Sequence, residues 1–234
     1  MKKQILLAAA VLFSAGMIFI TGCKKDDTTG PVITITGSAS EMSILNATWT
    51  DQGATAEDDE DGVVTVTSNA SSTNPNKDLA GTYSIVYKAT DAAGNESSAT
   101  RTVTVYNEAA AFFENGGAGY SSCSETDAAG PYTYQTAKPF KVTASTTQNN
   151  RVTMNRLADF DNNTVFMDIT GTSINIPSQT HTGVGIAGAA CDLHDRLTSG
   201  TGTKTATGFT LTYNDSKVAP CTGTRSGVVG VFNK

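Results

Sequence analysis

After residue 30, short segments of alternating apolar and polar residues follow one another, separated by turn-forming residues. Alternation with a period of two is the pattern of a β-strand with one buried face. Tyr83, Ile85, Tyr87 and Ala89 form one such row, and the segment Asp91–Asn95 after them is typical of a tight turn. No segment after residue 22 has the periodicity of a helix. The pattern therefore predicts an all-β protein built from many short strands.

The same alternation predicts further buried rows in the second half of the chain. These rows are Val165, Met167 and Ile169; Ile174 and Ile176; Phe209, Leu211 and Tyr213; and Val229 and Val231. The turns predicted between them are Asp161–Asn163, Gly183, Ser199–Gly202 and Asn214–Asp215. About eight strands are enough to close a small antiparallel β-barrel, and a two-sheet sandwich is the alternative.

Acidic residues are concentrated in the first half of the chain. The segment 31–107 has ten acidic and three basic residues, whereas 108–234 has ten acidic and nine basic residues. This change coincides with the end of the strand pattern at Asn107. We therefore place a domain boundary there, with one domain at 31–107 and a second at 108–234.

The N-terminus has the three parts of a bacterial lipoprotein signal. Lys2 and Lys3 are followed by the apolar run Ile5–Ile20, whose 16 residues are few for a membrane span. The run ends in Ile20-Thr21-Gly22-Cys23, which resembles the lipobox of signal-peptidase-II substrates. We predict a signal peptide at 1–22 and lipid on the Cys23 thiol as the membrane anchor. The alternative is an ordinary secretory signal with a chance cysteine.

Residues 23–30 are predicted to form a lipidated tether. Within it, Lys24-Lys25-Asp26-Asp27 resembles the export signal of surface lipoproteins in the Bacteroidetes. The same charges also suit a solvated linker that stays away from the bilayer. The prediction is thus an outer membrane lipoprotein, with the cell surface and the periplasmic face both left open.

The net charge argues against nucleic acid as a partner. Removal of residues 1–22 leaves 14 basic and 22 acidic residues, which is a net charge of −8. A protein that binds nucleic acid needs basic residues to neutralise phosphates, and no basic patch is present in this sequence.

Five segments of the first domain resemble a known family when they are taken in order. They are Pro31–Ile35, Thr50–Ala56, Asp59–Gly62, Ala80–Asn95 and Thr102–Val105. Together they resemble the bacterial Ig-like domain of Bacteroidetes surface lipoproteins, large repeat adhesins and a crystal-toxin C-terminal region. The family usually has Asp-Pro-Gly where this chain has Asp51-Gln52-Gly53. The resemblance implies an immunoglobulin-like sandwich that serves as a spacer, display or binding module and has no catalytic residues.

The densest acidic cluster is Glu57–Gly62, where Asp58, Asp59 and Asp61 are candidate ligands for Ca²⁺. Carboxylate oxygens on a flexible loop suit this ion, although the spacing is not that of an EF-hand loop. The preferred interpretation is a solvated turn. No metal or cofactor is therefore predicted.

Three cysteines follow Cys23, in a chain that export would place in an oxidising compartment. We predict a disulfide between Cys191 and Cys221, because each adjoins a strand that flanks the shared segment Phe209–Tyr213. The rival pairing is Cys123 with Cys221, since closure of a barrel sets its first strand beside its last. A zinc site of the three sulfurs and His194 is disfavoured, because the usual knuckle spacing is absent.

No motif of a catalytic site is found around His181, His194 or the serines, and no enzymatic activity is expected. The segment Asp168–Thr180 is similar to the C-terminal lipocalin-like barrels of the same lipoproteins. We expect a non-catalytic, membrane-anchored lipoprotein whose Ig-like spacer displays a domain that binds an unknown small molecule, glycan or protein. The alternative is a glycan-binding component of a polysaccharide-uptake system. Its candidate aromatic platforms are Tyr120, Tyr132, Tyr134 and Phe140.

Overall fold

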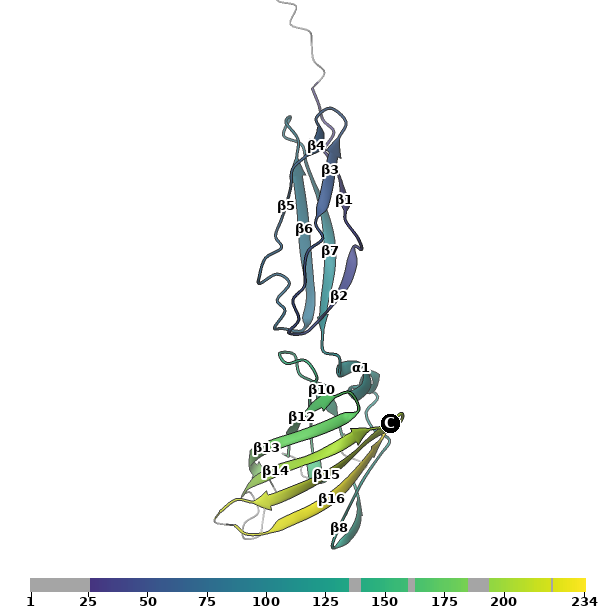
Figure 1. The fold of residues 1–234 in the computed structure, drawn as a ribbon, viewed down its shortest axis with the longest axis vertical. Helices are drawn as coiled ribbons and strands as arrows, with labels where there is room; N and C mark the ends of the chain where they lie inside the picture. Colours follow the sequence, from purple (N-terminus) through teal and green to yellow (C-terminus); the bar gives the residue numbers. More distant parts are fainter. Residues whose placement is uncertain (1–25, 135–139, 160–162, 185–193, 220) are drawn as a thin grey trace, which may run out of the picture.

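The computed structural model describes residues 26–134, 140–159, 163–184, 194–219 and 221–234 (Figure 1). The described strands form three sheets, which confirms the all-β prediction. Three short helical turns were not predicted, because each is too short to show a helical period: α1 (Ala110–Phe113), η1 (Asn115–Gly117) and η2 (Leu157–Asp159). No helix in the described segments is long and apolar enough to cross a bilayer.

The first two sheets form a sandwich. Their strands are β1 (Val32–Ile35), β2 (Ser40–Ile44), β3 (Ala54–Asp58), β4 (Gly62–Val64), β5 (Val66–Ser68), β6 (Gly81–Thr90) and β7 (Glu96–Tyr106). One sheet has the order β1-β3-β4 and the other the order β2-β7-β6-β5. The predicted row on β6 is confirmed, because Ile85, Tyr87 and Ala89 are buried. Ile33 of the facing sheet packs against this core, so the two sheets share one apolar layer.

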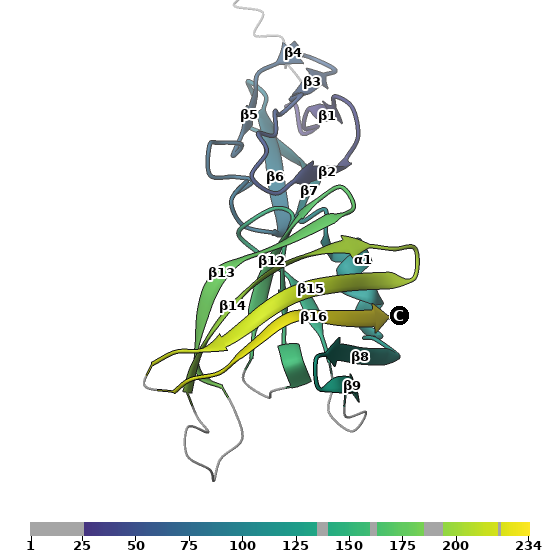
Figure 2. The same cartoon turned by 60° about the horizontal axis from the view of Figure 1, so that its bottom comes forward.

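The third sheet is a curled, nine-stranded half-barrel (Figure 2). Its strands are β8 (Ser122–Asp127), β9 (Gly130–Thr133), β10 (Val142–Ala144), β11 (Arg151–Met154), β12 (Val165–Thr170), β13 (Ser173–Val184), β14 (His194–Lys204), β15 (Gly208–Lys217) and β16 (Thr224–Asn233). The order is β10-β11-β12-β13-β14-β15-β16-β8-β9, and all pairs are antiparallel. Among the described strands β9 and β10 are not paired, and the sheet forms a curled half-barrel, which agrees with the predicted barrel-like second domain.

The apolar core of the half-barrel confirms most of the predicted rows. The rows on β12, β13 and the first part of β15 are buried as predicted. In β16, however, the buried residues are Val228, Gly230 and Phe232, and Val229 is 43% exposed. Because residues 228–232 are apolar on both faces, alternation could not choose between them. The pairing with β15 decides, since it sets Val228 opposite Tyr213 and fixes which face is buried.

Three predicted turns lie inside strands instead. Gly183 belongs to β13, Ser199–Gly202 to β14 and Asn214–Asp215 to β15. Glycine and asparagine favour turns in short peptides, but within a curved sheet glycine marks bulges and close backbone approaches. A Cβ atom on Gly202 would lie 2.2 Å from the carbonyl oxygen of Thr210 on the neighbouring strand. Glycine is therefore required here by strand packing.

The side chain of Asn107 links the sandwich to the half-barrel. It is 3% exposed, and its Nδ2 group donates to three carbonyl oxygens, two in the turn between β10 and β11 and one on the first residue of β11. These are the oxygens of Ser145 (2.9 Å), Gln148 (3.0 Å) and Arg151 (2.9 Å). No described strand pairs across this junction. The domain boundary at Asn107 stays a prediction. Independent folding of the two parts stays a prediction.

Candidate functional site

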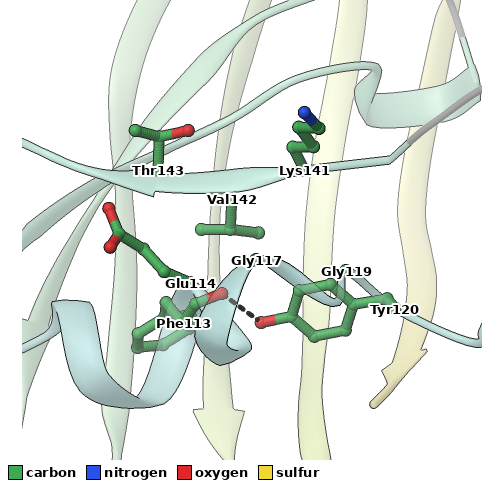
Figure 3. Close-up of a pocket in the computed structure, with 8 residues that line it drawn as sticks. All are labelled: Phe113, Glu114, Gly117, Gly119, Tyr120, Lys141, Val142 and Thr143. Atoms are coloured by element: carbon green, nitrogen blue, oxygen red, sulfur yellow. Dashed lines mark hydrogen bonds between the residues drawn. The ribbon is translucent and has the colours of Figure 1, made fainter.

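A small pocket opens between the α1–η1 segment and β10 (Figure 3). Its lining residues are Phe113, Glu114, Gly117, Gly119, Tyr120, Lys141, Val142 and Thr143. The volume is about 170 Å³. Pockets that enclose a drug-sized ligand measure roughly 300 to 1,000 Å³, so this pocket is small for a ligand site.

The polar groups of this pocket already hold the fold together. The Tyr120 hydroxyl donates to the carbonyl oxygen of Phe113 at 3.1 Å, as Figure 3 shows. The Glu114 carboxylate accepts a hydrogen bond from the amide of Ala144 at 2.8 Å. Burial raises the pKa of Tyr120, so the phenol stays a neutral donor. The side chains of Tyr120 and Glu114 are therefore engaged in contacts that hold the fold.

The aromatic residues proposed as glycan platforms are mostly used in the core. Tyr134 and Phe140 are 5% and 7% exposed, and Tyr120 packs against the same core. Phe140 stacks on Phe232 with ring centroids 5.2 Å apart. Of the four candidates only Tyr132 is strongly exposed, at 42%. The glycan-binding alternative is thus left with one of its four predicted aromatic contacts.

A cluster of buried charges crosses the interior of the half-barrel, and we name it the distal cluster. It consists of Glu125, Arg196, Tyr213, Asp215 and Arg225. Glu125 is 1% exposed and accepts hydrogen bonds from the hydroxyls of Tyr213 (2.6 Å) and Tyr134. Burial and the nearby Glu125 charge raise the pKa of Tyr213, which keeps its hydroxyl protonated as a donor. Arg225 forms an ion pair with Glu125, in which its Nη2 atom lies 3.4 Å from Oε2.

The second half of the distal cluster is a bidentate ion pair between Arg196 and Asp215. The Nε atom of Arg196 donates to Asp215 Oδ1 at 2.8 Å, and the Nη2 atom donates to Oδ2. Beside it, burial lowers the pKa of His181, an effect that Asp215 partly offsets. The Nε2 atom of His181 is buried with no hydrogen-bond partner in the described structure. Within the described part of the chain, Glu125 and Asp215 are each paired with an arginine, which is typical of a structural cluster.

Sequence reasoning missed the distal cluster, although one signal for it was present. The predicted buried row Phe209, Leu211 and Tyr213 continues with a period of two to Asp215. We assigned Asn214–Asp215 to a turn because these residue types favour turns. The strand instead continues to Lys217, and Asp215 is 0% exposed.

The predicted cation ligands are separated by the structure. Asp58 ends β3 and is 7% exposed, whereas Asp59 and Asp61 are exposed in the hairpin turn that follows. Asp61 accepts a hydrogen bond from the amide of Ala92 at 2.6 Å, which joins this turn to the turn between β6 and β7. A single loop thus does not gather the three carboxylates, and the partners of Asp58 come from elsewhere.

Two predicted site residues, Cys23 and Cys191, lie outside the described residues. Cys221 is disulfide-bonded, and Cys123 is buried in the core at 6% exposure. His194 begins β14, so it lies close in sequence to the end of the segment that contains Cys191. The predicted pairing of Cys191 with Cys221 stays a prediction.

Peptide mapping without reductant is expected to recover Cys191 joined to Cys221. That bond closes a loop of about 30 residues and should stabilise the half-barrel by roughly 3 to 4 kcal/mol in the chain-entropy model. Replacing either cysteine by serine should lower the unfolding free energy by a similar amount, whereas reductant should have no further effect on the variant. Recovery of Cys123 joined to either partner would refute the assignment.

Comparison with known proteins identifies the sandwich. Residues 33–105 match the family model described as bacterial surface protein, Ig-like domain. The sandwich is thus similar to bacterial surface Ig-like domains. This finding confirms the predicted resemblance for the first domain. The match covers less than a third of the chain, and it assigns no family to the half-barrel.

Two solved structures are similar to the chain at low identity. One is a lipoprotein from Bacteroides thetaiotaomicron, with 12% identity, 87% of this chain and 100% of that chain covered, and a TM-score of 0.30. The other contains CBM51-2 in complex with GlcNAc and INT domains from Clostridium perfringens ZmpB. Its identity is 14%, with 86% of this chain and 43% of that chain covered, and a TM-score of 0.26. Scores this low establish no shared fold. No curated protein matches the chain.

Proposed function

We propose that this chain is a non-catalytic lipoprotein, anchored through Cys23, that displays the half-barrel on an Ig-like spacer. The observation that carries the proposal is the placement of the two ends of the sandwich. The described chain begins at one end of the sandwich, and the half-barrel lies beyond the opposite end (Figure 1). A lipid on Cys23 would therefore hold the half-barrel away from the bilayer by the length of the sandwich.

Hydrogen bonds at both ends support this arrangement. At the anchor end, the Asn95 side chain donates to the carbonyl oxygen of Asp27 at 3.3 Å. At the other end, Asn46 accepts a hydrogen bond from the amide of Asn149 in the half-barrel at 2.7 Å. The ten residues of β6 run between these ends. At about 3.4 Å per residue, β6 spans roughly 30 Å, and the sandwich would separate the half-barrel from the tether by about this distance.

A binding or display role for the half-barrel is supported by how its polar groups are used. The distal cluster satisfies its own charges, and the polar groups of the small pocket hold α1 and β10 in place. The proposed ligand of the half-barrel is a small molecule, a glycan or a protein.

The variant Cys23→Ala is expected to lose its membrane anchor. The thiol is the attachment point for the lipid, and each buried CH₂ group contributes about 0.8 kcal/mol to membrane binding. In detergent phase partitioning of cell extracts, the variant should be found in the aqueous phase, whereas the wild-type protein should be found in the detergent phase. Cys123→Ala, which leaves the lipobox intact, is the matched control and should stay in the detergent phase. A Cys23→Ala protein that still partitions with detergent would exclude this anchor.

A further inference from the structure

Three aspartates from separate parts of the chain meet at the anchor end of the sandwich. Asp27 lies in the tether, Asp58 ends β3, and Asp91 begins the turn between β6 and β7. Each offers a carboxylate oxygen, and the three oxygens lie within 4.8 Å of one another. Of the described residues, no lysine or arginine forms an ion pair with any of them. The group therefore concentrates negative charge without a described basic partner.

One oxygen of this group is buried and lacks a hydrogen bond. Asp58 is 7% exposed, and its Oδ1 atom accepts hydrogen bonds from the amides of Glu60 and Asp61, both at 3.0 Å. The Oδ2 atom is buried with no donor in the described structure. A buried carboxylate oxygen is costly unless a donor or a cation compensates it. Because Oδ1 is already occupied, Oδ2 is the oxygen of Asp58 that remains for an ion.

The residues around the group fix its three segments in place. The Asn95 side chain donates to Asp91 Oδ2 at 2.8 Å and to the carbonyl oxygen of Thr29 at 3.2 Å. Its backbone amide donates to Asp91 Oδ1 at 2.7 Å. Asn95 therefore positions both the turn and the tether. The position of the β3–β4 hairpin is fixed by the contact between Asp61 and the amide of Ala92.

We propose that Asp27, Asp58 and Asp91 bind a calcium ion. The three proposed metal ligands are all carboxylate oxygens, and the group contains no histidine or cysteine. Such a set of ligands favours a hard cation over zinc or copper. Calcium accepts six to eight oxygen ligands in irregular geometry, so backbone oxygens and water can complete the shell. Magnesium demands a near-ideal octahedron and releases its water reluctantly, which suits three separate loops less well. Only Asp58 is shared with the ligand set predicted from sequence.

The ion would fasten the tether to the sandwich four residues after Cys23. Without it, repulsion among the three carboxylates opposes the hydrogen bonds from Asn95 that hold the tether. Calcium would thus strengthen an attachment that those hydrogen bonds alone make weakly. This consequence rests on the proposed lipid anchor, but the site itself uses only residues after Cys23 and does not depend on lipid.

The test is calcium titration of the full-length mature protein in detergent, after treatment with EDTA. Calorimetry is expected to give one Ca²⁺ per chain with a Kd on the order of 10⁻⁴ M, as in extracellular modules. Millimolar CaCl₂ should raise the midpoint of thermal unfolding relative to EDTA. Absence of both effects overturns the proposal, as does binding of Mg²⁺ at equal affinity.

Two variants and one matched control assign the residues. Asp58→Asn and Asp27→Asn are each expected to weaken calcium binding by roughly tenfold or more. Asp59→Asn removes the same charge from an exposed position in the same hairpin and should leave the Kd unchanged. Equal weakening in all three would mean a diffuse acidic surface and would overturn the site. If Asp58→Asn does not fold, Asp27→Asn decides, because Asp27 lies outside every described strand.

Discussion

Replacement of Arg101 by alanine is expected to lower the free energy of unfolding of the sandwich by about 3 to 5 kcal/mol. The Arg101 side chain is 0% exposed. Its Nη1 atom lies 3.0 Å from Asp51 Oδ1 and 3.3 Å from Glu41 Oε1. Its Nη2 atom donates to the carbonyl oxygen of Thr36. Alanine would leave two mostly buried carboxylates side by side without their cation, as well as a cavity.

The size of this effect follows from what the guanidinium connects. Arg101 belongs to β7 and Glu41 to β2, whereas Asp51 precedes β3 of the facing sheet. The Tyr87 hydroxyl also donates to Asp51, and the Trp49 indole donates to Glu41 at 2.8 Å. One buried cation therefore organises polar groups on both sheets. Loss of one member leaves the others unsatisfied in a medium of low polarity.

Denaturant unfolding of the full-length protein measures the Arg101→Ala effect. Because the sandwich and the half-barrel have separate cores, we expect two transitions, of which only that of the sandwich should shift. Lys88→Ala is the matched control, since it removes an exposed ion pair with Glu96 on the same sheet. Its expected effect is below about 1 kcal/mol. Similar small shifts for both variants would contradict the network.

The variant Asp215→Asn is expected to destabilise the half-barrel by about 3 to 5 kcal/mol. Asp215 is 0% exposed and Arg196 is 5% exposed, and they form a bidentate pair between β14 and β15. Asparagine keeps the shape of the side chain but removes the negative charge. The buried Arg196 guanidinium would then lose the bidentate carboxylate that Asp215 provides, and burial of a charge is costly when its pairing is weakened.

A similar pair nearer the surface provides the control for Asp215→Asn. Arg151 and Asp168 are also bidentate, but their side chains are 26% and 34% exposed. Asp168→Asn should therefore cost less than about 1 kcal/mol. Replacing both Arg196 and Asp215 by leucine should recover part of the loss, because no uncompensated charge remains buried. A single Asp215→Asn variant that unfolds like the wild type would show that this pair carries no stability.

The strands could be predicted where a strand is buried on one face. The row Ile85, Tyr87 and Ala89 needs no neighbour to be recognised, because alternation is a local property of β6. The same argument was wrong for Val229 and Val231, where both faces of β16 are apolar. The separate prediction of a turn at Ser199–Gly202, made from its glycine and serine content, was also wrong, because these glycines allow the close approach of β15. In both cases pairing with the neighbouring strand decides the outcome: which face of β16 is buried, and whether β14 continues through its glycines. The local sequence does not identify that neighbouring strand.

The sequence by itself indicated the all-β class and the Ig-like resemblance, since each depends on residues adjacent in the chain. The lipid anchor is also read from adjacent residues and stays a prediction. Only the tertiary structure brought Asp27 and Asp91 to Asp58, across 64 positions of sequence from the first to the last. It alone also paired Arg196 with Asp215 and buried Arg101 between carboxylates. The sequence around a charged residue does not show whether that residue will be solvated or buried. That outcome depends on which distant segments fold against it and on whether they supply a compensating charge.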